Sequence, residues 1–186
     1  TAASLFDGHD ASINIFRRLL QAGGAEVIHL GHNRSVGQVV EAIVQEDVQA
    51  VAISSYQGGH TEYFRYLKEL LRQRGYDHVK IFGGGGGVIV PEEIRALHAD
   101  GIDHIYSPED GRRLGLQGII QDILNRSDYN VAELGAPTVA ELAAGNVRAL
   151  ARAITLLEED RLRPGIFPAE LKAWLAVEAP ARCPVV

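Results

Sequence analysis

The sequence predicts an α/β fold built on a doubly wound sheet of five parallel strands. Short apolar runs alternate five times with segments whose apolar residues recur at helical spacing, over residues 1–125. The run at residues 48–54 is almost wholly apolar, as expected of a central parallel strand that is covered on both faces. After residue 127 the strand-like runs stop, so any further structure there is expected to be helical.

The expected strands are short apolar runs that end in a turn or in glycine. They cover residues 1–6, 25–30, 48–54, 79–82 and 102–106. The helices expected after them are amphipathic. They cover residues 13–21, a segment from Val36, residues 61–74, a segment from Pro91, and residues 111–125. For a chain of this size the flavodoxin-like strand order 2-1-3-4-5 is the expected arrangement.

Local signals mark the ends of these helices. The pair Gly23-Gly24 should end the first helix, and Asn33-Arg34 and Ser107-Pro108 are expected to be turns. The hydroxyl of Ser35 can cap the second helix. Gln38 can close the capping box there, and proline with two acids begins the fourth helix at residues 91–93. The inward face of the second helix should carry Val36, Val39, Val40, Ile43 and Val44, and that of the third Tyr63, Tyr66, Leu67, Leu70 and Leu71.

The last third of the chain predicts a helical extension. A break at residues 135–137 is followed by a capping box of Thr138 and Glu141, which begins one Ala- and Leu-rich helix expected over residues 139–159. A linker at residues 161–168 and a short helix at residues 169–177 complete it. We therefore expect a first domain at residues 1–130 and a helical linker at residues 131–186.

Bulk properties exclude several classes of protein. The net charge of −6, from 18 basic and 24 acidic residues, argues against nucleic-acid binding, and no apolar run is long enough to cross a membrane. The single cysteine, Cys183, excludes a disulfide framework and a cysteine-based metal site. No signal-peptide pattern precedes the first strand, which favours a cytoplasmic location, and the abrupt ends suggest a piece of a longer polypeptide.

In an open parallel sheet a ligand binds over the carboxyl ends of the strands. Seven of the twenty glycines fall in two of the loops expected there, at residues 58–59 and 83–87, where missing Cβ atoms would let a broad, flat ligand approach the backbone. The alternative interpretation of the glycine run at residues 83–87 is a flexible turn. The run lacks the Lys-Ser/Thr pair of a Walker loop. A phosphorylated receiver would need Asp and Lys where Ser54 and Ser107-Pro108 stand, and the acidic first loop disfavours the FMN phosphate of a flavodoxin.

The first of these loops contains an Asp-x-His triplet at Asp7 and His9. A carboxylate can orient an imidazole by accepting a hydrogen bond from one ring nitrogen, which leaves the other free for a metal. One histidine suffices when a cofactor supplies the remaining ligands. The alternative is an acid that caps the next helix. A zinc site of His9 with His29 and His32 lacks a carboxylate, and His60 is expected only to begin a helix.

At these loops the chain resembles the B12-binding domain of adenosylcobalamin-dependent acyl-CoA mutases, which carries Asp-x-His-x-x-Gly, Ser-x-Leu and Gly-Gly motifs in this order. Residues 7–12, 54–56 and 83–87 match them, with Ser12 for the glycine and Tyr56 for the leucine. Residues that the resemblance and the loop positions place at the cofactor are Asp7, Gly8, His9, Asp10, Ser12, Ser54, Tyr56, Gly84, Gly85, Gly86, Tyr106 and Ser107.

The resemblance implies that cobalamin binds with its own base displaced and with His9 as the lower axial ligand of cobalt. Four stretches within residues 6–118 are most similar to fused mutases of the isobutyryl-CoA type. In these, a cobalamin domain, a GTPase chaperone domain that uses GTP and Mg²⁺, and an acyl-CoA-binding barrel share one polypeptide. A homodimer is expected for the full-length form. The alternatives are a non-catalytic cobalamin carrier or sensor, of the corrinoid methyl-transfer or light-sensing type, and an interaction domain without cofactor.

Overall fold

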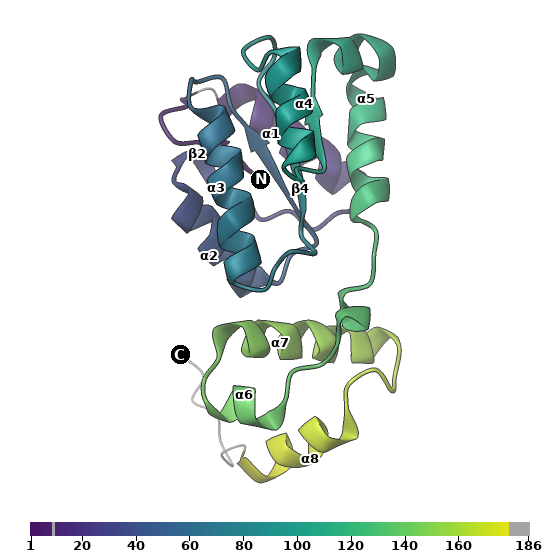
Figure 1. Cartoon of the computed structure of the whole chain (residues 1–186). Helices are drawn as coiled ribbons and strands as arrows, with labels where there is room; N and C mark the ends of the chain where they lie inside the picture. Colours follow the sequence, from purple (N-terminus) through teal and green to yellow (C-terminus); the bar gives the residue numbers. More distant parts are fainter. Residues whose placement is uncertain (9, 179–186) are drawn as a thin grey trace. The chain divides into compact units, whose positions relative to one another are not determined.

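A five-stranded parallel sheet forms the centre of the computed structural model, which describes residues 1–8 and 10–178 (Figure 1). The strands are β1 (Ala2–Ser4), β2 (Gly31–Arg34), β3 (Ala50–Ser54), β4 (Lys80–Gly84) and β5 (His104–Tyr106). Their order is β2-β1-β3-β4-β5 and all four pairings are parallel, which confirms the predicted fold class and strand order.

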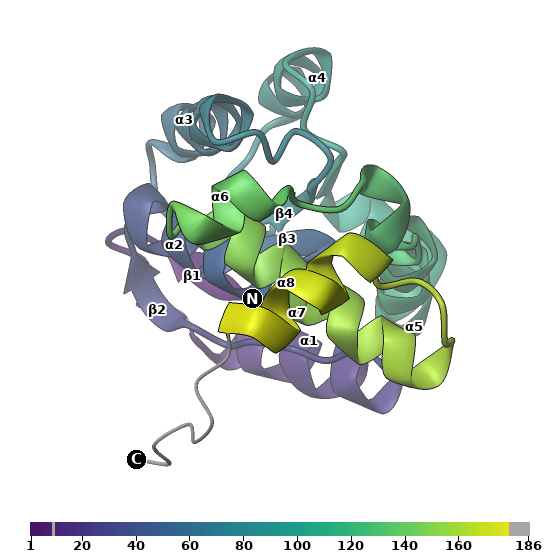
Figure 2. The same ribbon diagram turned by 90° about the horizontal axis from the view of Figure 1, so that it is seen from below.

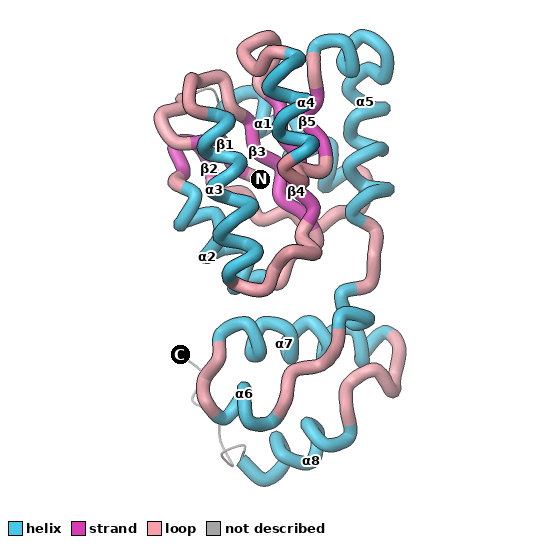
Figure 3. The backbone as a smooth tube through the Cα atoms, in the orientation of Figure 1, coloured by secondary structure: helices cyan, strands magenta, loops and turns pink. Residues whose placement is uncertain are grey.

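Helices cover both faces of this sheet. They are α1 (Asp10–Ala22), α2 (Val36–Glu46), α3 (His60–Gln73), α4 (Pro91–Ala99) and α5 (Pro108–Ser127). Helices α1 and α5 contact each other on one face, and α3 and α4 contact each other on the other, as the view along the sheet shows (Figure 2). The five expected helices are all present, and the loops that enter them from the strands meet at one edge of the sheet (Figure 3).

The predicted ends of α2 are confirmed. The Ser35 hydroxyl accepts a hydrogen bond from the Gln38 backbone N–H at 3.3 Å, and the Gln38 side chain accepts one from the Ser35 N–H at 3.1 Å. All five residues predicted for the inward face of α2 are buried.

Two expectations for the sheet and α3 were wrong. The second strand is not residues 25–30 but Gly31–Arg34, because Gly31 and Arg34 are the residues in register with Ala2 and Ser4 of β1, and Asn33-Arg34 therefore lies in a strand rather than a turn. In α3, Tyr66 is 55% exposed, whereas Phe64 is fully buried. The Phe64 ring occupies the space that a Cβ on Gly83 of β4 would need.

The expected turn at Ser107-Pro108 is instead the start of α5. Ser107 is the N-cap and Pro108 the first helical residue, so that α5 begins before the predicted residue 111. The helix bends at Gly115, where φ is +64° and ψ is 174°.

The chain divides into two compact units, Thr1–Ile43 with Val48–Tyr129, and Val44–Asp47 with Asn130–Val186. The second unit contains a 3₁₀ turn (Val131–Leu134), α6 (Val139–Ala143), α7 (Val147–Leu162) and α8 (Ala169–Glu178). The single helix predicted for residues 139–159 was wrong, because Gly145 adopts φ of +69° and Asn146 caps a new helix.

The second unit has its own apolar cluster and a buried ion pair. The cluster consists of Ala153, Leu156, Phe167 and Leu171. The Arg152 guanidinium donates to both carboxylate oxygens of Asp47, at 2.5 and 2.8 Å, and to the Val131 carbonyl. Among residues 1–8 and 10–178, no helix combines the length and the apolar character that a membrane span requires.

Candidate functional site

A cavity of about 200 Å³ opens at the carboxyl edge of the sheet, between α1, α5 and strands β3 to β5. Eight of the twelve residues predicted for the site line it. They are Ser12, Ser54, Tyr56, Gly84, Gly85, Gly86, Tyr106 and Ser107. The sequence-predicted loops after β3, β4 and β5 therefore do come together in the folded chain, as parallel strands require.

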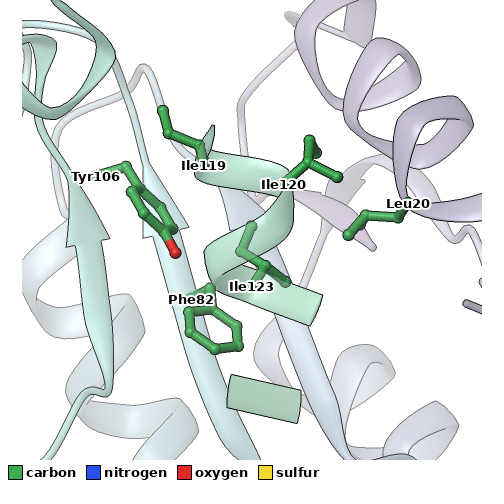
Figure 4. Packing of buried hydrophobic residues seen from close by; sticks show 6 residues of the cluster. All are labelled: Leu20, Phe82, Tyr106, Ile119, Ile120 and Ile123. Atoms are coloured by element: carbon green, nitrogen blue, oxygen red, sulfur yellow. The ribbon is translucent and has the colours of Figure 1, made fainter. Parts of the chain in front are cut away.

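Apolar side chains from α1, α5 and the sheet make up much of the cavity wall. They are Ile13, Phe16, Ala52, Phe82, Ile119 and Ile123. Phe82 and Tyr106 stack with ring centroids 6.4 Å apart, and both face the isoleucines of α5 (Figure 4). Sequence reasoning did not assign these residues to the site. Their helical and strand spacing predicted burial, but a buried residue that faces a cavity has the same spacing as one that faces the core.

Two glycines allow the loop after β4 to approach the loop after β3. A Cβ placed on Gly85 would lie 1.8 Å from the Ser55 carbonyl oxygen, well inside any permitted contact. Gly86 has φ of +58°, and a Cβ there would lie 3.1 Å from the Tyr56 ring. The Ser55 N–H also donates to the Gly84 carbonyl at 2.8 Å. The glycine run thus brings its backbone into close contact with the loop after β3. Its first two members, Gly83 and Gly84, belong to β4.

Asp7 connects the loop after β1 to the loop after β3. Its side chain is fully buried, and its Oδ2 accepts a hydrogen bond from the Tyr56 backbone N–H at 2.7 Å. The Ser4 hydroxyl donates to the Ser55 hydroxyl at 2.8 Å in the same region, and the Ser12 and Ser54 hydroxyl oxygens lie 3.4 Å apart. Polar contacts from Ser4, Asp7 and Ser12 therefore reach the end of β3 and the loop that follows it.

A network of polar side chains supports the β5 side of the cavity. The Tyr106 hydroxyl donates to Asp122 at 2.7 Å, and burial together with this contact raises the pKa of Tyr106 well above its usual range. Burial alone would raise the pKa of Asp110, but hydrogen bonds from the Ser107 N–H and hydroxyl and from Arg113 outweigh it and hold that pKa at about 2. The Tyr106 hydroxyl is thus neutral and the Asp110 carboxylate charged at neutral pH.

The other four predicted site residues lie in the loop after β1. Asp7 is buried as described, whereas Gly8 is exposed and has no atom within 4 Å of a built Cβ. His9 lies outside the described residues, and Asp10 begins α1. The described residues contain no group of three or more His, Cys, Asp or Glu side chains that could hold a metal ion by themselves.

His29, weighed above as a zinc ligand, lies beside the Thr1 hydroxyl. Its Nδ1 and Thr1 Oγ1 are 2.9 Å apart. Burial, helped by Arg17, lowers its pKa.

The cavity suits a flat aromatic group that carries polar substituents. Its aromatic and aliphatic wall matches an aromatic ring, the glycine backbone at residues 84–86 leaves room for close approach, and the hydroxyls of Ser12 and Ser54 can hydrogen-bond to oxygen atoms. The nucleotide tail of cobalamin, a benzimidazole on a ribose phosphate, has this combination of groups, so the residues present fit the cofactor that the loop motifs imply.

Comparison with known proteins agrees with these features. Residues 1–114 match the family model described as B12 binding domain. The chain is 60% identical over 169 residues to a fused isobutyryl-CoA mutase of Cupriavidus metallidurans, an alignment that covers 91% of this chain and 16% of that protein. It is 61% identical over 158 residues to the fused isobutyryl-CoA mutase of Geobacillus kaustophilus, covering 85% of this chain and 14% of the other.

Two further comparisons involve proteins that are not named as fused mutases. The 2-hydroxyisobutanoyl-CoA mutase small subunit of Aquincola tertiaricarbonis is 30% identical over 99 residues, which are 53% of this chain and 71% of that subunit. A crystal structure of a novel cobalamin-binding protein from Desulfitobacterium hafniense superposes with a TM-score of 0.54 at 24% identity, covering 67% of this chain and 56% of the other, which shows a shared fold. The chain spans about a sixth of the length of the fused mutases that it matches.

Proposed function

Because the chain belongs to the B12-binding domain family, we propose that it is the cobalamin-binding portion of an adenosylcobalamin-dependent acyl-CoA mutase. The high identity to fused isobutyryl-CoA mutases supports a carbon-skeleton isomerase of the isobutyryl-CoA/butyryl-CoA type. Since this chain corresponds to a sixth of those proteins, the activity belongs to a larger assembly in which this part holds the cofactor.

The observation that carries the proposal is the cavity between α1, α5 and the glycine loop. The nucleotide tail of cobalamin would enter it with the base detached from the metal. Phe16, Tyr56 and Phe82 would contact the flat base, and the hydroxyls of Ser12 and Ser54 would bond to the tail's oxygen atoms. Gly85 and Gly86 would lie against the tail through their backbone.

We assign His9 as the lower axial ligand of cobalt, with Asp7 as the residue that orients it. The resemblance to the B12-binding domains of acyl-CoA mutases implies this role for His9, and the Asp-x-His spacing agrees with it. The full burial of Asp7 supports it, because a buried carboxylate requires hydrogen-bond donors around it. The bound cofactor would supply radical chemistry through homolysis of its cobalt–carbon bond. The residues of this chain would position the cofactor, exclude water from its tail and adjust the donor strength of the axial imidazole.

The partners follow from the same assignment. An acyl-CoA-binding barrel would provide the substrate site, and a GTPase chaperone domain with GTP and Mg²⁺ would control loading of the cofactor. Both would belong to the same polypeptide or to a separate chain, in a homodimeric, cytoplasmic enzyme. The separate small subunits among the relatives support the idea that a cobalamin domain can work as an independent polypeptide.

Cofactor binding tests the proposal directly. Adenosylcobalamin added to the 186-residue chain should give a one-to-one complex whose absorption spectrum is that of a cobalamin with a lower nitrogen ligand, and His9→Ala should shift this spectrum to that of the base-off form. In the cobalt(II) state, ¹⁵N labelling of histidine should change the electron paramagnetic resonance coupling pattern in the wild type, and His9→Ala should remove that sensitivity. A coloured complex whose spectrum is unchanged in His9→Ala would refute the ligand assignment, and absence of any complex would refute the function.

A further inference from the structure

The buried residue His60, at the first position of α3, connects two loops of the site. Only 6% of it is exposed. Its Nδ1 lies 3.1 Å from the backbone oxygen of Gln57, and its Nε2 lies 2.9 Å from Oε2 of Glu93 on α4. Both partners are oxygen acceptors, one a carbonyl and the other a carboxylate. Glu93 is 33 residues away in sequence, so this is a tertiary contact.

Glu93 continues the connection to the glycine loop. The same Oε2 that faces His60 accepts a hydrogen bond from the Val90 backbone N–H at 3.0 Å. The hydrogen bond from the Val90 N–H, and secondly that from the His60 ring, hold the pKa of Glu93 below its usual value. Glu93 is therefore the charged partner at neutral pH, and the contact joins residues 57–60 to the end of the loop that follows β4.

These two segments form one wall of the cavity. Tyr56 precedes the first segment, and Gly85 and Gly86 precede the second, and all three line the cavity. The close approach of Gly86 to the Tyr56 ring depends on the separation of the two segments, since a Cβ at Gly86 would already lie 3.1 Å from that ring. The His60–Glu93 contact lies behind this wall, on the helices α3 and α4 that follow it.

Both ring nitrogens of His60 face oxygen acceptors. A neutral imidazole has one N–H and one lone pair, so it can donate to only one of two acceptors. Only the doubly protonated ring can donate to both Gln57 and Glu93. The charged group in contact with the ring is Glu93, while the neighbouring acids Glu92 on α4 and Glu62 on α3 are exposed.

We propose that His60 and Glu93 are positioning residues of the cobalamin site, in which the doubly protonated His60 ring bonded to Glu93 fixes the distance between the Tyr56 loop and the glycine loop. This inference rests on the proposed function. Loss of the second ring proton would leave a lone pair facing an oxygen, separate the two loops and loosen the wall of the cavity. Cofactor affinity should therefore follow the protonation of this ring.

The test uses the 186-residue chain with adenosylcobalamin in the dark as the probe, because its upper axial ligand does not titrate near neutral pH. Dissociation constants are measured by absorbance between pH 5.5 and 8.5 for the wild type, His60→Gln and Glu93→Gln. The matched control is Glu69→Gln, which removes an acid that pairs with Arg72 on the same helix α3 but outside the cavity wall. The ring protonation of His60 is followed by ¹⁵N NMR of histidine-labelled protein, with His60→Gln providing the assignment.

Below the pH at which the wild-type His60 ring loses its second proton, both site variants should bind about tenfold more weakly than the wild type, as expected for loss of a charge-assisted hydrogen bond. The wild-type affinity should fall as the pH rises through that deprotonation. This direction is opposite to proton competition at an axial imidazole, which weakens binding as the pH falls. Glu93→Gln should flatten the profile, and Glu69→Gln should leave it unchanged.

The outcomes are distinguishable. If the wild type binds no cobalamin at any pH, the proposed function fails. If it binds and the NMR titration shows His60 deprotonating without a change in affinity, the positioning inference is wrong even if a variant fails to fold, because this measurement uses the wild type alone. An equal loss in Glu69→Gln would also overturn it, since the effect would then not depend on the loop-to-loop contact.

Discussion

The Asp7 carboxylate accepts a hydrogen bond from the Tyr56 backbone N–H at 2.7 Å, which joins the loop that contains the predicted cobalt ligand to a residue that lines the cavity. The Asp7 side chain is fully buried, and Tyr56 follows the central strand β3. In the sequence alone, Asp7 could be assigned to its neighbour His9 or to the cap of the next helix. The structure shows that Asp7 accepts a hydrogen bond from the loop after β3.

Replacement of Asp7 should separate its hydrogen-bonding role from its charge. Asp7→Ala leaves the Tyr56 N–H without this acceptor and should lower the free energy of unfolding by about 2 kcal/mol. Asp7→Asn retains a carbonyl oxygen that can accept from Tyr56, so it should lose less than half as much. Urea unfolding of the chain measures both, with the more exposed Asp77→Ala as control. Equal losses in Asp7→Ala and Asp7→Asn would show that the charge, and not the Tyr56 contact, matters.

The glycine loop gives a matched pair of substitutions. Gly85→Ala places a Cβ 1.8 Å from the Ser55 carbonyl oxygen, so one of the two loops must move. Gly87→Ala meets no atom within 4 Å, and its φ is not in the left-handed region. We expect Gly85→Ala to weaken adenosylcobalamin binding at least tenfold and to destabilise the chain, and Gly87→Ala to bind like the wild type. A Gly85→Ala variant with wild-type affinity would show that the close approach is unimportant for the site.

The sequence was sufficient for the strand order and for most of the helices, because alternation of apolar runs with amphipathic segments reports burial directly. Sequence reasoning failed where strand pairing or the local backbone conformation determines the structure. The apolar run at residues 25–30 looked more like a strand than Gly31–Arg34, but register with β1 selects the latter. The sequence predicted one long helix across Gly145. A single glycine in an Ala- and Leu-rich segment does not reveal from sequence alone that its φ is positive.

At the candidate site, the sequence motifs predicted which loops form the cavity but not which helix and strand residues line its wall. Ser54, Tyr56 and the glycines were recognisable because they follow expected strands and match the motifs of the B12-binding family. Ile119 and Ile123 were not, since an isoleucine on α5 that faces a cavity resembles any core residue. The contact of His60 with Glu93 joins positions 33 residues apart, and neither residue type is unusual at the start of a helix.

The proposed binding of the nucleotide tail in the cavity can be tested by reducing the volume of the cavity. Ala52 lies on β3 and lines the cavity, so Ala52→Leu adds three carbon atoms to a space of about 200 Å³. The variant should bind adenosylcobalamin at least tenfold more weakly. Its affinity for cobinamide, which lacks the nucleotide tail, should be the same as that of the wild type. The two titrations are compared by absorbance. An equal loss of affinity for both ligands would show that the substitution does not act through binding of the nucleotide tail.

The capping box at the start of α5 predicts a defined dependence of stability on pH. Because the pKa of Asp110 is about 2 in the folded chain and near 3.8 when unfolded, the unfolded state binds more protons between these values. The stabilisation, at most about 2 kcal/mol, is complete above pH 4 and is lost as the pH falls through 2. Ser107→Ala removes the hydroxyl that donates to Asp110 and accepts from its N–H, so at pH 5 it should cost about 1 kcal/mol.

Near pH 2.5 the difference between Ser107→Ala and the wild type should shrink, because Asp110 is then partly protonated in both. Urea unfolding at pH 5 and pH 2.5 measures this change. Glu109→Gln is the control, since Glu109 is an exposed acid in the same turn that pairs with Arg112. If Ser107→Ala lost the same free energy at both pH values, the hydroxyl would act only as an N-cap, and the low pKa of Asp110 would have to come from the Ser107 N–H and Arg113.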